Sequence, residues 1–94
     1  FSEGRNIVRR ILAAGCQVCL HMYGGPVGLY ASAHLAAAIG EVSLLEMDSL
    51  PNPLFEMVLQ GAPRVDGGRL ELPAGAGLGD DLIRPQVFDG AEIR

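Results

Sequence analysis

Two ionisable residues, His21 and Glu46, each follow a short apolar run and could carry out proton chemistry. His21 comes after residues 17–20, and Glu46 comes after residues 42–45. An imidazole can take up a proton near neutral pH and return it, which suits a general base. Plainer interpretations stay open for both. His21 could be a polar strand-end residue bonded to a neighbour, and Glu46 could bind a neighbouring side chain or a substrate hydroxyl.

Tyr23, Gly24 and Asp48 are candidate substrate-binding residues close to these two. Gly24 belongs to a Gly-Gly-Pro sequence at which a helix can begin, and backbone N–H groups at a helix start can bind an anion. A substrate carboxylate or hydroxyl could contact this loop, although turn geometry and packing explain the same glycines equally well. Asp48 follows Glu46 by two residues, so a continuous strand would place both side chains on one face.

Cys16 and Cys19 have the CxxC spacing of redox motifs and of half a zinc site. The sequence has no further cysteine to complete a zinc site, and redox pairs sit at helix starts. Here the pair falls on a predicted strand with the two thiols on opposite faces, so we interpret both as small packing residues. His34 lies in an Ala-rich segment and is interpreted as a core or interface residue. No metal-ligand set is predicted within the chain.

The elements that must position His21 and Glu46 alternate between helix and strand. Four are predicted in this order: a helix at 3–14 with Ser2 as N-cap, a strand at 17–20, a helix at 27–39 ended by Gly40, and a strand at 42–45. The first helix has an apolar stripe made of Ile7, Val8, Ile11 and Leu12. Two strands joined by a helix predict a right-handed βαβ unit with parallel strands. His21 and Glu46 would then share one rim, where α/β proteins build their sites.

The chain changes character after residue 48. Two prolines break any regular element, and residues 54–60 form either a short helix or an extended segment. Residues 64–72 predict a hairpin around Asp-Gly-Gly. Residues 73–79 are too rich in glycine for a regular element, and residues 80–94 are polar with fraying expected. We therefore expect residues 49–94 to form a tail that packs on something else.

Composition excludes several classes of function. The 94 residues carry a net charge of −4, with seven arginines and no lysine, which argues against nonspecific nucleic-acid binding. The longest uncharged stretch is too polar and broken to cross a membrane, and the chain does not open with a signal peptide, so a cytoplasmic location is expected. Two parallel strands need cover on both faces and neighbours at both edges. We therefore expect one piece of a larger barrel or sheet that begins within a longer protein.

Several short sequences occur in an order that is similar to a known family. They are residues 15–21, 25–29, 31–38, 44–46, 51–54 and 77–79. This order resembles the C-terminal end of the mandelate racemase and muconate lactonizing enzyme family, within the enolase superfamily. The resemblance runs from Ser2 to about Leu82, and Ala76 departs from it where relatives often carry proline. It implies an α/β fold: the C-terminal segment of a modified (β/α) TIM-like barrel at residues 1–48, with a tail at 49–94 returning to an α+β capping domain.

The resemblance also implies a chemistry. Family members bind Mg²⁺ and remove the proton α to a carboxylate, with metal ligands on strands outside this chain. His21 would be the base, paired with an aspartate upstream of Phe1. Glu46, when protonated, would donate a hydrogen bond to the substrate carboxylate, which requires burial to raise its pKa.

The first choice of function is a sugar-acid dehydratase within a longer enzyme. Racemisation or epimerisation of a 2-hydroxy acid is the alternative, and a non-catalytic barrel fragment is a third possibility. The isolated 94 residues are predicted to be inactive because they lack the metal-binding strands. The partners expected are a small carboxylate substrate, the rest of the barrel and the capping domain, and a second copy of the protein in a homo-oligomer.

Overall fold

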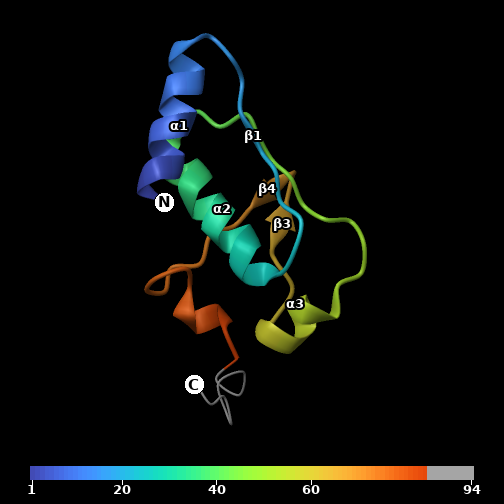
Figure 1. The fold of residues 1–94 in the computed structure, drawn as a ribbon. Helices are drawn as coiled ribbons and strands as arrows, with labels where there is room; N and C mark the ends of the chain where they lie inside the picture. Colours follow the sequence, from blue (N-terminus) through green and yellow to red (C-terminus); the bar gives the residue numbers. More distant parts are fainter. Residues whose placement is uncertain (85–94) are drawn as a thin grey trace, which may run out of the picture.

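The structure, a computed structural model, describes residues 1–84 of the chain (Figure 1). In chain order its elements are α1 (Ser2–Ala13), β1 (Cys19–Leu20), α2 (Pro26–Ile39), β2 (Leu44–Leu45), α3 (Pro53–Val58), β3 (Val65–Asp66), β4 (Arg69–Leu70) and a 3-10 helix, η1 (Asp80–Leu82). The alternation of helix and strand up to β2 agrees with the predicted α/β class. Of residues 80–94, which were predicted to be polar and frayed, those from residue 85 onward lie outside the described residues.

β1 and β2 form a parallel pair, as predicted, in which Cys19 lies opposite Leu44. The pairing continues past the strand ends, because the N–H of Glu46 donates to the carbonyl of Leu20 at 3.1 Å. Each strand is shorter than its apolar run. In the described part of the chain, β1 and β2 have only each other as neighbours, and a two-stranded ladder gives little support to a longer regular strand.

α2 connects the two strands and supplies the centre of the core. Leu29 is 0% exposed, and Tyr30 and Ala33 are also buried. The helix begins at Pro26, whose ring suits the first helical position. It ends where predicted, at Gly40, which has a left-handed conformation with φ of 79° and donates its N–H to the carbonyl of Ala36 at 2.9 Å.

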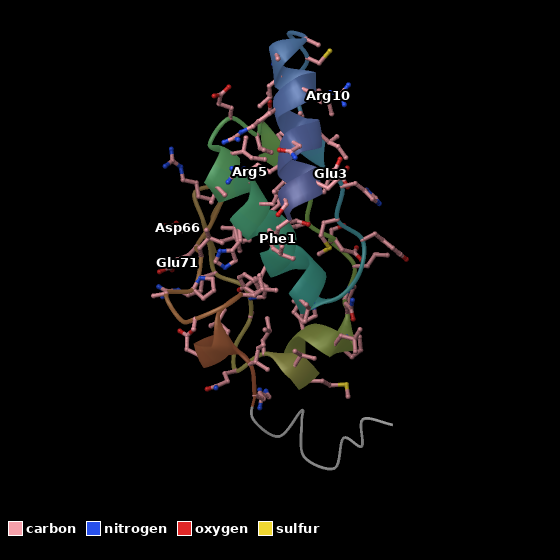
Figure 2. All side chains as sticks on the ribbon, turned by 60° about the vertical axis from the view of Figure 1, so that its left-hand side comes forward. Phe1, Glu3, Arg5, Arg10, Asp66 and Glu71 are labelled. Atoms are coloured by element: carbon pink, nitrogen blue, oxygen red, sulfur yellow. The ribbon has the colours of Figure 1, made fainter. Side chains whose placement is uncertain are left out.

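α1 packs against α2 but differs from its prediction in two ways. The helix includes Ser2, and Phe1 occupies the N-cap position without a side-chain hydrogen bond, so the predicted serine cap is wrong. Of the predicted apolar stripe, Val8 is buried while Ile7 and Ile11 are exposed. Only the side of α1 that faces α2 is covered among the described residues. Figure 2 shows Phe1 at the start of α1, next to α2.

The second half of the chain forms the predicted hairpin and a returning tail. β3 and β4 are antiparallel, and Gly67 and Gly68 at the turn both have positive φ, at 54° and 76°. Residues 54–60 are helical for most of their length, as α3. The chain after η1 then comes back to α3, where Ile83 forms an isolated antiparallel bridge with the buried Leu59. The tail thus packs on the end of α3 in the described structure.

Candidate active site

The β1–β2 pair has one covered face and one open face. Along β1 the side chains alternate: Val18 and Met22 are buried, whereas Cys19 and His21 are exposed. Alternate residues of a strand point to opposite faces, so His21 shares the open face with Cys19. Leu44, which lies opposite Cys19, is 68% exposed on that face. The open face is therefore apolar at the strands and polar at their carboxyl ends.

His21 and Glu46 meet at the carboxyl ends of these strands. Nδ1 of His21 lies 2.6 Å from Oε2 of Glu46, and the backbone N–H of Met22 donates to the same oxygen at 3.2 Å. The side chains are 80% and 47% exposed, respectively. The rim predicted from the βαβ pattern is present, and it brings the two candidate residues into direct contact.

The hydrogen bonds that Glu46 accepts determine its protonation. The bond from His21, followed by the bond from the N–H of Met22, holds the pKa of Glu46 below its ordinary value. Glu46 is therefore an ionised acceptor, and Nδ1 of His21 carries the proton between them. This leaves Nε2 of His21 as the nitrogen able to take up a further proton. A Glu46 that donates a hydrogen bond to the substrate would need a raised pKa, whereas the pKa of Glu46 is lowered here.

The other predicted substrate-binding residues flank this pair without a hydrogen bond to it in the described structure. Tyr23 is 77% exposed in the loop between β1 and α2. Gly24 lies next to it, and its carbonyl accepts a hydrogen bond from Nδ2 of Asn52 at 3.2 Å. Asp48 accepts the N–H of Leu50 at 2.9 Å, so its carboxylate stabilises the turn after β2.

Asn52 is the residue at this rim that sequence reasoning missed. Its Oδ1 also accepts the N–H of Leu54 at 3.0 Å, which caps α3. An asparagine followed by Pro53 is a recognisable helix-start signal, and this signal could have predicted the cap. The bond to Gly24 spans 28 residues of sequence, and no local pattern predicts it.

The two cysteines and His34 lie apart from the rim. Cys16 and Cys19 are both free and exposed, so their interpretation as packing residues is wrong for the described chain. Cys16 follows α1 in an irregular segment, and Cys19 lies on the open face of β1, where no other described segment covers it. His34 is half-buried within α2, and its Nε2 is enclosed without a hydrogen-bond partner among the described residues.

No metal-ligand cluster surrounds the His21–Glu46 pair in the described part of the chain. A cleft of about 400 Å³ lies between the β2–α3 loop, α3 and residues 61–63; Asp48 and Asn52 line it, whereas His21 and Glu46 do not. Within residues 1–84, no group of three or more histidine, cysteine, aspartate or glutamate side chains could hold a metal ion. The helices of this region are also too short or too polar to cross a membrane.

A parallel βαβ unit with an imidazole and a carboxylate at the ends of its strands is characteristic of α/β proteins that bind or react at the rim of a sheet or barrel. A family model described as enolase C-terminal domain-like, and named for mandelate racemase and muconate lactonizing enzyme, matches residues 1–86. The chain belongs to this family and is a C-terminal part of an enolase-superfamily protein. No curated protein and no solved structure matches it.

Proposed function

We propose that this chain supplies the general base of an enolase-superfamily enzyme that removes the proton α to a carboxylate, and that the enzyme dehydrates a sugar acid. The observation that supports the proposal is the 2.6 Å contact between Nδ1 of His21 and Oε2 of Glu46. A carboxylate hydrogen-bonded to one imidazole nitrogen fixes the orientation of the ring. The other nitrogen, Nε2, is then directed to act as the base.

The proposed reaction uses His21 twice. Nε2 takes the proton from the α carbon, and Glu46 stabilises the imidazolium that results. In a dehydration the β hydroxyl then leaves, and the imidazolium can return the proton to it so that water is released. Members of the superfamily generally use Mg²⁺, which stabilises the enediolate. The described residues do not form a site for the ion, and the steps assigned here to His21 and Glu46 do not depend on its position.

Dehydration is proposed before racemisation because of the resemblance to the histidine-using members of the family, and residues outside the described chain decide between the two reactions. Racemisation needs a second base on the opposite side of the α carbon. The chain has two histidines, and His34 is enclosed within α2 rather than at the rim. A racemase or epimerase remains the alternative, with its second base supplied from outside residues 1–84. A structural chain without catalysis is the third possibility.

The proposal includes the expected surroundings of the chain. The open face that carries Cys19 and Leu44 is apolar and uncovered among residues 1–84. This supports the expectation that the rest of the barrel packs there. Free cysteines are compatible with the expected cytoplasmic location. The expected homo-oligomer stays a prediction.

The test is exchange of the substrate α proton for deuterium. The intact protein that contains this chain is incubated in D₂O with Mg²⁺ and a panel of sugar acids, and exchange and dehydration are followed by NMR. We expect His21→Asn to slow exchange by about 10²- to 10⁴-fold, the range for loss of a general base. His34→Gln is the matched control and should exchange at the unmutated rate. Unchanged exchange in His21→Asn would assign the base to another residue.

A further inference from the structure

Two loops begin at the rim, one after His21 and one after Glu46, and hydrogen bonds connect them at two places. The loop after β1 runs from His21 through Tyr23 and Gly24 to the start of α2, and the loop after β2 runs from Glu46 to the start of α3. Figure 1 shows the start of α2 and α3 at the same end of the molecule. The first junction is the bond between His21 and Glu46, at 2.6 Å. The second junction is made by Asn52.

Both polar atoms of the Asn52 side-chain amide form hydrogen bonds. Oδ1 accepts the N–H of Leu54 at 3.0 Å, and Nδ2 donates to the carbonyl of Gly24 at 3.2 Å. The two partners fix the orientation of the amide, because one offers a donor and the other an acceptor. Asn52 is half-buried, so the bond to Gly24 is partly shielded from water. An aspartate could make the first of these bonds but not the second.

The loop that Asn52 holds has little stiffness of its own. It contains consecutive glycines, and Gly24 has a φ of 147°, a conformation that side-chain-bearing residues rarely adopt. A flexible loop loses conformational entropy when it is fixed, so an external bond contributes directly to its order. Leu54 supports the same loop, since its Cδ1 lies 3.6 Å from the point where a Cβ on Gly25 would be.

We propose that Asn52 is a positioning residue, which holds the loop containing Tyr23 and Gly24 in a fixed place beside His21 so that the loop can receive the substrate. The part of this inference that concerns substrate rests on the proposed function. Asn52 acts through the loop and does not take part in proton transfer. Its loss therefore weakens substrate binding more than it slows the chemical step.

The test separates the bond to Gly24 from the helix cap. Asn52→Asp keeps an oxygen for the N–H of Leu54 and replaces the donor to Gly24 with a second acceptor. In the intact protein we expect its KM to rise about tenfold while kcat changes less than twofold. Asn52→Ser, which keeps a cap but cannot reach Gly24, should behave in the same way. An unchanged KM in both variants would overturn the inference.

A second readout does not need activity. Backbone ¹⁵N relaxation and amide hydrogen exchange in the intact protein should show the amides of Tyr23, Gly24 and Gly25 more mobile in Asn52→Asp, while the amide of Leu54 stays protected. The matched control is Gln60→Glu, because Nε2 of Gln60 donates to the carbonyl of Ile83 at 3.3 Å, away from the rim. Unchanged loop amides in Asn52→Asp, or equal changes in Gln60→Glu, would contradict a positioning role.

These two readouts distinguish the failure of one proposal from the failure of the other. If the unmutated protein shows no α-proton exchange with any sugar acid, the proposed function fails. The amide measurements still decide whether Asn52 holds the loop. If exchange is present and the loop amides do not respond to Asn52→Asp, the proposed function stands and the positioning role is rejected.

Discussion

At the scale of single residues, the contact between His21 and Glu46 makes a pH-dependent contribution to stability. Because hydrogen bonds hold the pKa of Glu46 below its ordinary value, the folded chain binds fewer protons there than the unfolded chain does at acidic pH. The stabilisation is present above the pKa of the unfolded carboxyl and is lost as pH falls through the lower pKa of the folded one. The pair is exposed, so we expect a modest effect.

This pH dependence can be measured at the carboxyl itself. In a ¹³C NMR titration, the side-chain carboxyl carbon of Glu46 should titrate below the ordinary range of a glutamate. In His21→Ala the pKa of Glu46 should move back towards that range, because the largest cause of its lowering is removed. His34→Ala should leave the pKa of Glu46 where it was. A Glu46 that titrates at the same pH in His21→Ala would show that the contact is not maintained in solution.

At the scale of elements, α2 should carry more of the stability than any exposed segment. Leu29 is 0% exposed in its centre, whereas Val27 is 56% exposed two residues earlier on the same helix. Leu29→Ala should lower the free energy of unfolding by about 2–5 kcal/mol through lost burial and a cavity. Val27→Ala should change it by less than about 0.5 kcal/mol. Urea unfolding measures both, and equal losses would contradict the burial described for α2.

The segment before η1 depends on a close approach at Gly79. Its φ is 107°, and a Cβ there would overlap the ring of Pro73, whereas Gly40 also has a positive φ but open space around it. Gly40→Ala should cost about 1–2 kcal/mol for the left-handed conformation alone. Gly79→Ala should cost a further 1–3 kcal/mol or so for overpacking. Thermal unfolding compares the two, and an equal cost would show that Pro73 moves away freely.

The elements that could be predicted are those defined by local signals. α2 follows from Pro26 and Gly40, and the β3–β4 hairpin follows from its paired glycines. Strand length could not be predicted, because the number of neighbouring strands decides it. The interpretation of Cys19 as a packing residue was wrong for a related reason. The alternation of residues along a strand does not tell which of its two faces another segment covers. At the site, the βαβ pattern predicted that His21 and Glu46 share a rim. The hydrogen bond between these two side chains, and the one from Asn52 to the carbonyl of Gly24, depend on tertiary geometry that no local pattern gives.

At the scale of the whole molecule, the described chain brings His21 and Glu46 together, and residues 1–84 contain no group of side chains that could hold a metal ion. We therefore expect the isolated 94-residue chain to give no α-proton exchange with Mg²⁺ and sugar acids. The assay used for the intact protein serves here, with that protein as the positive control. Turnover by the isolated chain would contradict the view that the remaining strands complete the site.

The parallel register of β1 and β2 limits how this chain can change its length. Side chains alternate between the two faces of a strand, so a slip of one residue moves each of them to the other face. A single residue inserted between Val18 and His21 would turn the imidazole towards the covered face of the strand pair, where Val18 and Met22 are buried, and carry it away from Glu46. The same insertion after Leu50, in the loop that leads to α3, would leave both strands in place. Insertions and deletions should therefore be selected against within the few residues that precede the rim, and in the β2–α3 loop they would shift Asn52 relative to Gly24.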